Sequence, residues 1–365
     1  MRAKGPNAGA AGDRNGPLVV VLGAGATRAC SFVNPKKSSC LPPLDGDFFT
    51  QLQRVPDPKH RDHIGVVMAD VMQLFGSNFS VTLETAFATV EHTLRMLATT
   101  GARREFEKQD LQQKRDRLLA AIAIAMEASL TERGSGGGST RTPRPCAHHE
   151  TLVEKVLQQG DHVISFNYEC VLDYALKAKG DGKWNARYGY GFNLGPRGVN
   201  LRGDDAWQPS MPASKSDTIQ VHKLHGSLHF QFAGPEARQI ALKQRPYTKQ
   251  NGTPRFSIIP PESNKAYDRG IFAQLWKNAA LALGRARHVV VIGYSFPATD
   301  LHTGALFRTS IKEGALQSVV VVNPDRAARA RARDLLQRGM HPGTRVLSFD
   351  SVGEFLATDP SVWRG

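Results

Sequence analysis

The sequence predicts an α/β fold, in which a Rossmann-like doubly wound parallel sheet carries a helical insertion after its first strand. Three observations lead to this fold class. Short, continuous apolar runs recur along the chain, which is typical of strands buried on both faces. Amphipathic helical patterns alternate with the later runs. A long, mainly helical segment separates the first run from the second.

The six predicted strands are apolar runs at residues 17–22, 162–166, 219–224, 288–292, 318–322 and 345–349. The helices expected between the later strands cover residues 150–159, 272–283 and 301–311. The first of these stops at Gly160, a plausible helix-ending glycine. Within the insertion, residues 83–97 carry leucine, phenylalanine and valine at helical spacing, and residues 103–129 predict a second helix.

The domain organisation follows from these elements. Residues 1–16 are expected to form a flexible tail. Residues 17–29 and 160–365 together are expected to form the Rossmann-like core. Residues 30–159 are the mainly helical insertion, and residues 132–145 (ERGSGGGSTRTPRP) within it predict a flexible linker.

Composition excludes two classes of protein. Of the 365 residues, 41% are hydrophobic and 22% are charged, which excludes wholesale disorder. No apolar run reaches the roughly 18 residues of a membrane span. No signal-peptide core precedes Pro17. We therefore expect a soluble, cytoplasmic protein without a membrane partner.

The charge and the cysteines narrow the candidate partners. The net charge of +14 leaves nucleic acid open as a partner or trigger, although the densest arginine cluster, residues 326–333, is equally typical of a solvated helix face. The four cysteines are too few and too scattered for a disulfide framework. None forms a C-x-x-C pair, so a zinc site built from two such pairs is not expected either. We expect no metal.

The first motif that carries chemistry is Gly23, Ala24, Gly25, Ala26 and Thr27, directly after the first strand. Two glycines at this place allow a tight turn and let the backbone approach a pyrophosphate, which the N–H groups of the next helix then face. The third glycine of the dinucleotide fingerprint is missing, and an ordinary strand–helix turn is the alternative interpretation.

Two further motifs place a polar side chain after a strand. Asn167 follows the run at 162–166, where its amide can both donate to and accept from a ribose hydroxyl or a water; the alternative is an N-cap for a helix starting near Glu169. His225, followed by Gly226, can accept a proton near neutral pH. A structural histidine bonded to backbone is the alternative.

The last two strand ends are also polar or small. Gly293 and Ser295 follow the run at 288–292 and can line a diphosphate. Asn323 and Asp325 follow the next run and can hold ribose hydroxyls, although turn chemistry explains them equally well. Strand carboxyl ends share one edge of a parallel sheet, so the coincidence of these motifs predicts a dinucleotide site there.

Taken in order, these motifs resemble those of the sirtuin superfamily. The family patterns G-A-G-x-S, Q-N-[YI]-D, H-G, G-[TS]-S and I-N are similar to residues 23–27, 166–169, 225–226, 293–295 and 322–323. No cysteine follows Cys170, so the four-cysteine zinc module of sirtuin deacylases is absent from the sequence. What remains resembles bacterial sirtuin-like NAD hydrolases of anti-phage defence.

This resemblance implies an NAD+ glycohydrolase that cleaves the nicotinamide–ribose bond to give nicotinamide and ADP-ribose. Asn167 would bind a ribose hydroxyl or position the attacking water, and His225 would accept a proton. The residue 23–27 loop, with Gly293 and Ser295, would hold the diphosphate. Asn323 would bind the adenosine ribose.

The sequence leaves alternatives open. The same pocket would serve a protein deacylase or ADP-ribosyltransferase, or a non-catalytic nucleotide-binding partner module. Besides NAD+, we expect a homo-oligomer and a separate ATPase or nuclease-like sensor protein as partners. The trigger, the oligomer size, a linear or cyclic product and the preference for NAD or NADP stay undetermined.

Overall fold

A computed structural model describes most of the chain. The described residues are 16–99, 105–133, 141–192, 194, 218–233, 239–242, 257–258, 270–297 and 300–365. The predicted tail, apart from Gly16, lies outside the described residues, as do residues 134–140 of the predicted linker.

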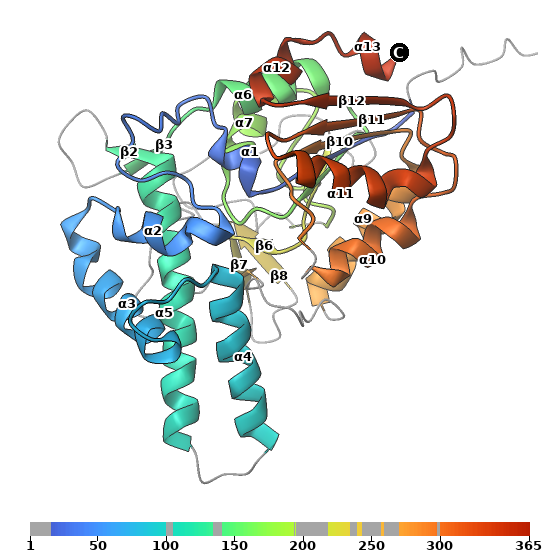
Figure 1. The fold of residues 1–365 in the computed structure, drawn as a ribbon. Coiled ribbons are helices and arrows are strands. Elements are labelled where there is room, and N and C mark those ends of the chain that lie inside the picture. The colour runs from blue at the N-terminus through green and yellow to red at the C-terminus, as the bar shows by residue number, and fades with distance from the viewer. Residues whose placement is uncertain are drawn as a thin grey trace, which may run out of the picture.

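The centre of the molecule is a six-stranded sheet in which every strand pair is parallel. Its strands are β1 (Leu18–Leu22), β4 (His162–Ser165), β5 (Gln220–Lys223), β10 (His288–Ile292), β11 (Ser318–Val322) and β12 (Arg345–Phe349). They lie side by side in the order β12-β11-β10-β1-β4-β5, and Figure 1 shows β12, β11 and β10 next to one another. The chain therefore reverses its direction of winding between β1 and β10, as in a Rossmann sheet. The predicted fold class is confirmed.

Helices cover both faces of this sheet, because alternate side chains of each central strand point to opposite sides. Val20 packs in a core cluster with α7 (Val171–Lys179), α12 (Val352–Ala357) and α13 (Ser361–Arg364). Its neighbours Val19 and Val21 pack on the opposite face. That face is covered by α9 (Gly270–Arg285), α10 (Leu301–Ser310) and α11 (Arg326–Leu336).

One predicted helix differs from the structure. The pattern at 150–159 corresponds to α6 (Ala147–Thr151), which continues as a π-helical turn over Leu152–Val156. The backbone leaves helical geometry at Leu157, so Gly160, although its φ is +82°, does not end this helix.

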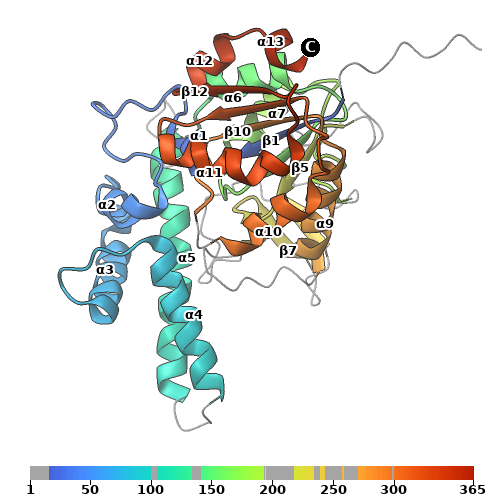
Figure 2. The same cartoon turned by 45° about the vertical axis from the view of Figure 1, so that its right-hand side comes forward.

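The region after β1 is helical, as predicted. It begins with α1 (Ala24–Arg28) and continues through α2 (Phe48–Gln53), α3 (Arg61–Phe75), α4 (Leu83–Thr99) and α5 (Glu105–Leu130). Short 3-10 turns, Asp45–Asp47 and Pro58–His60, precede α2 and α3. The long helices α4 and α5 lie side by side and extend away from the sheet (Figures 1 and 2). Their apolar faces form a core of their own.

The remaining described elements are a 3-10 turn after α11 (Gln337–Gly339) and three two-stranded ribbons. The ribbon β2 (Thr131–Arg133) with β3 (Arg141–Pro143) follows α5. The other two pair β6 (Gly226–Ser227) with β9 (Ser257–Ile258), and β7 (Phe230–Ala233) with β8 (Gln239–Leu242). Among the described helices, none has both the length and the apolar character needed to cross a membrane.

Candidate functional site

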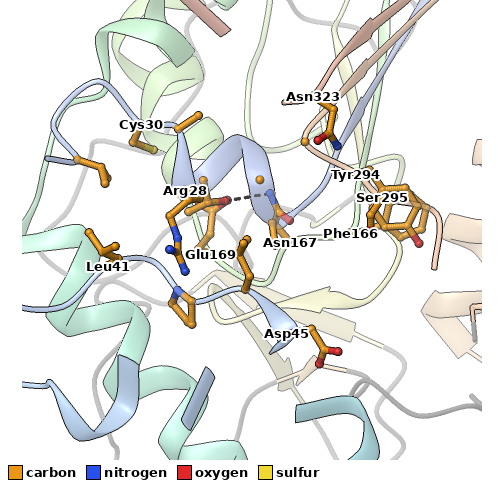
Figure 3. Close-up of a pocket in the computed structure, with 18 of the residues that line it drawn as sticks. Arg28, Cys30, Leu41, Asp45, Phe166, Asn167, Glu169, Tyr294, Ser295 and Asn323 are labelled. Atoms are coloured by element: carbon orange, nitrogen blue, oxygen red, sulfur yellow. Dashed lines mark hydrogen bonds between the residues drawn. The ribbon is translucent and has the colours of Figure 1, made fainter. Parts of the chain in front are cut away.

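A cavity of about 1010 Å³ lies at the carboxyl ends of the strands (Figure 3). Eight of the ten predicted site residues line it: Ala24, Gly25, Thr27, Asn167, His225, Gly293, Ser295 and Asn323. Gly23 and Ala26 do not. Ala26 is only 2% exposed and packs in the core beneath the loop, while the Gly23 carbonyl accepts hydrogen bonds. The structure thus brings residues from five strand ends to one cavity.

The first loop packs directly on the loop after β10. The N–H of Gly25 donates to the Gly293 carbonyl across 2.9 Å. A Cβ at Gly25 would come within 2.8 Å of the Gly293 Cα, and one at Gly293 within 2.1 Å of the Ala26 nitrogen. Gly293 also has a φ of +61°, which favours glycine. Close packing between two loops is therefore a reason for these glycines that the sequence did not reveal.

Asn167 joins the end of β4 to the first loop. Its side-chain amide donates to the Gly23 carbonyl and to the Thr27 hydroxyl, both at 3.0 Å. It does not cap a helix, because α7 begins at Val171 with Cys170 as its N-cap. With both amide hydrogens bonded inside the protein, the side-chain oxygen is the atom suited to accept a bond from a ligand hydroxyl.

Glu169 anchors this arrangement from behind. One carboxylate oxygen accepts from the Thr27 hydroxyl at 2.8 Å, and the other accepts from the N–H of Val171 at the start of α7. A chain of hydrogen bonds therefore runs from Asn167 through Thr27 to a buried carboxylate. Figure 3 shows Asn167 and Glu169 together beside α1. The acidic residue was visible in the N-Y-E motif, but its role as an anchor was not predicted.

His225 reaches the cavity from the end of β5 and faces a carboxylate. Its Nε2 lies 3.9 Å from Oδ2 of Asp300. That oxygen also accepts from the Tyr294 hydroxyl at 2.6 Å and the Thr303 hydroxyl at 2.8 Å. The ring of His225 meets the ring of Phe166 edge-on, with centroids 5.2 Å apart. The Asp300 carboxylate therefore lies where it can stabilise the positive charge of the imidazole when His225 takes up a proton.

Asp300 was not predicted as a site residue. Its sequence signal is that of a helix N-cap, and it does cap α10 by accepting from the N–H of Thr303 at 3.3 Å. Asp300 also lines the cavity and faces His225, and no local sequence pattern indicates this second role.

The helical insertion supplies the opposite wall of the cavity. Arg28 forms an ion pair with Asp47 and donates to the Pro42 carbonyl at 2.5 Å, which holds the segment before α2 against α1. The insertion side chains that line the cavity include Leu41, Asp45, Leu83, Glu84, Ile122 and Met126. The cavity therefore lies between the sheet and the insertion.

Part of the chain matches a known protein family. Residues 161–341 match the family model described as the SIR2-like domain. This range contains five of the predicted site residues: Asn167, His225, Gly293, Ser295 and Asn323. The first loop and the insertion precede the match. No curated protein matches the chain.

Proposed function

Because residues 161–341 carry a SIR2-like domain, which implies NAD-related activity, we propose that the chain is an NAD+ glycohydrolase. One observation carries the proposal: Asn167 and His225, from the ends of the adjacent strands β4 and β5, line the same cavity as the glycine loop after β1. This cavity edge, next to the switch between β1 and β10, is where Rossmann-like sheets bind dinucleotides.

The lining of the cavity suits an extended dinucleotide. Its volume of about 1010 Å³ lies at the upper end of the usual range for small-molecule sites. In the proposed pose, Asn323 binds the adenosine ribose. The diphosphate lies between Gly25 and Ser295, and the nicotinamide ribose lies beside Asn167 and His225.

The proposed reaction is hydrolysis at the anomeric carbon of the nicotinamide ribose. The bond from this carbon to the nicotinamide nitrogen breaks, and its electron pair leaves with nicotinamide. The oxygen of a water molecule forms the new bond, giving ADP-ribose. Asn167 holds the ribose hydroxyl or the water through its amide oxygen. His225 accepts the proton that the water or a ribose hydroxyl gives up, and the Asp300 carboxylate, 3.9 Å away, stabilises the resulting charge.

The positions of the cysteines in the sequence favour hydrolysis over transfer to a protein. No cysteine follows Cys170, so the chain has no counterpart of the four-cysteine module that helps frame the acyl-lysine cleft of deacylases. A deacylase or ADP-ribosyltransferase, and a nucleotide-binding module without activity, are the competing functions.

The biological role proposed with this activity is depletion of NAD+ in anti-phage defence, as the resemblance of the motifs implies. Such an activity needs restraint, so we propose control by self-association or by a separate ATPase or nuclease-like sensor protein. In this proposal, residues 17–29 and 160–365 are the catalytic core. Residues 30–159, whose helices α4 and α5 extend away from the sheet (Figure 2), form the contact surface.

The experiment incubates purified wild-type, Asn167→Ala and His225→Ala chains with NAD+ and quantifies nicotinamide and ADP-ribose by chromatography. We expect the wild type to release both in equal amounts without an acceptor protein. Each variant should be slower by about 100-fold or more. His341→Ala is the control, because His341 is exposed and does not line the cavity. This variant should match the wild type.

Three results would contradict the proposal. Equal release by the wild type and both site variants would remove Asn167 and His225 from the mechanism. Product formation that depends on an acceptor protein would indicate a deacylase or transferase. Binding of NAD+ that stays intact over hours would indicate a non-catalytic module.

A further inference from the structure

We propose that Cys30, Cys146 and His149 bind a zinc ion beside the cavity, a site that goes beyond the proposed function. All three side chains are buried, and their ligand atoms lie within 4.8 Å of one another. The Cys146 sulfur lies 3.2 Å from Nδ1 of His149. Two thiolate sulfurs and an imidazole nitrogen form a ligand set that binds zinc in preference to harder divalent ions.

The local structure brings these ligands together. Cys146 is the N-cap of α6, and His149 lies in its first turn, so the C-x-x-H spacing places both on one side of the helix. Cys30 comes from the turn after α1, where its N–H donates to the Thr27 carbonyl at 3.2 Å. Thr27 is also the residue that accepts from Asn167, so the cluster adjoins the candidate catalytic loop.

Further contacts hold the turn that contains Cys30 against the start of α6. Nδ1 of His148 lies 2.8 Å from the Ala29 carbonyl, and the N–H of Ala147 donates to the Ser31 hydroxyl at 2.8 Å. These bonds clamp the residues next to Cys30 against the start of α6. Ligands that are positioned by their surroundings lose less entropy when a metal binds.

Zinc would bind both cysteines as thiolates and His149 as a neutral imidazole. The two thiols then give up two protons for each ion bound, and the two thiolates offset the charge of Zn²⁺. No net charge is left in a buried site, where an uncompensated charge is costly. Cys30 lines the cavity, so a water molecule can complete a tetrahedral site from that side.

A second cluster of potential ligands is less suited to a metal ion, because a positively charged side chain already pairs with it. Cys170, Asp173 and His229 also lie within 4.8 Å of one another. There the Lys223 ammonium already donates to Asp173 at 2.9 Å, and the Tyr190 hydroxyl donates to its other oxygen at 2.6 Å. A positive side chain already neutralises that carboxylate, so a metal ion would compete with Lys223.

The test measures metal content and cobalt spectra of the full-length chain. After equilibration with zinc and gel filtration, we expect about one zinc per wild-type chain, and less than about 0.1 for Cys30→Ser/Cys146→Ser. Cys40→Ser is the matched control, because Cys40 is also a buried thiol but hydrogen-bonds to the Gln51 carbonyl outside the cluster. It should bind as much zinc as the wild type.

Cobalt(II) added to the wild type should give thiolate-to-metal charge-transfer absorption and the visible bands of tetrahedral coordination. This readout needs no variant, so it decides the matter even if the double variant fails to fold. Calorimetric titration in buffers of different ionisation enthalpy should give about two protons released per zinc.

The site would be overturned by a wild type without zinc, by a cobalt spectrum without thiolate ligation, or by equal zinc loss in Cys40→Ser. A Cys30–Cys146 disulfide that forms equally fast with and without zinc would do so too. None of these measurements uses NAD+, so failure here is distinguishable from failure of the proposed glycohydrolase activity.

Discussion

The hydroxyl of Thr27 donates a hydrogen bond to the buried carboxylate of Glu169 across 2.8 Å, and it accepts one from Asn167 at 3.0 Å. Residues that are about 140 positions apart in the sequence are thereby fixed against each other. The orientation of the Asn167 amide in the cavity therefore depends on a hydroxyl at residue 27.

Thr27→Val tests this dependence, since valine keeps the shape but removes the hydroxyl. It leaves the Glu169 carboxylate and the Asn167 amide each short of a partner, so we expect nicotinamide release to fall by about 10- to 100-fold. Thr27→Ser keeps the hydroxyl and should stay within about threefold of the wild type. Equal activity of the valine and serine variants would contradict the role of this bond.

Asp300 is expected to act as a positioning residue for His225. Asp300→Asn keeps the size of the side chain but removes the charge 3.9 Å from the imidazole. We expect kcat to fall by about tenfold or more while KM stays within about twofold, because the lost interaction strengthens as His225 takes up a proton. Steady-state kinetics on NAD+ measures both. A raised KM with unchanged kcat would instead assign Asp300 to substrate binding.

Gly293 and Gly314 form a matched pair for testing the contact between the two loops. Both have positive φ, +61° and +60°, but only Gly293 is crowded, whereas nothing lies within 4 Å of a Cβ at Gly314. Gly314→Ala should cost about 1 kcal/mol of unfolding free energy. Gly293→Ala adds a steric clash with the first loop and should cost about 3 kcal/mol or more. Urea unfolding of the two variants measures the difference, and equal losses would show that the loops separate without cost.

His288 is expected to make stability depend on pH. Burial, aided by the charges of Arg364, Arg345 and Arg287, lowers the pKa of His288 from 6.5 to about 4. As the pH falls from about 6.5 to about 4, His288 binds a proton in the unfolded chain but not in the folded chain. The histidine therefore destabilises the fold progressively below about pH 6.5, by up to about 3 kcal/mol near pH 4.

The variant His288→Gln removes this titration. Urea unfolding at several pH values between 7 and 4.5 should show a smaller loss of stability for the variant than for the wild type. Carboxylates titrate in both chains, so the difference between the two curves reports on His288. Parallel curves would refute the assignment.

The sheet could be predicted from the sequence because its strands leave a local signature. Runs such as residues 288–292 and 318–322 are buried on both faces and are therefore apolar throughout. The predicted helix over residues 150–159 ends early, at Val156, and no local sequence signature indicates this. The Lys183 ammonium donates to the carbonyls of Val153, Glu154 and Leu157 at 3.0–3.1 Å, and so satisfies the last turn from a distant part of the chain.

The site was predictable only in part, for a related reason. Asn167 and His225 stand at strand ends, which a sequence pattern can locate. The partners that orient them, Glu169 and Asp300, are defined by contacts between distant segments. The same holds for Cys30, whose nearest ligand partners come from the start of α6. A search for C-x-x-C pairs could not find a cluster assembled in this way.

The order of strands in the sheet has a consequence for how the protein is made. Leu18 pairs with His288 on one side and Val19 with His162 on the other, so the central strand is synthesised first and receives its last neighbour late. Until then β1 presents an edge of unpaired backbone N–H and C=O groups during translation. We therefore expect a fragment that ends before His288 to aggregate rather than adopt this fold.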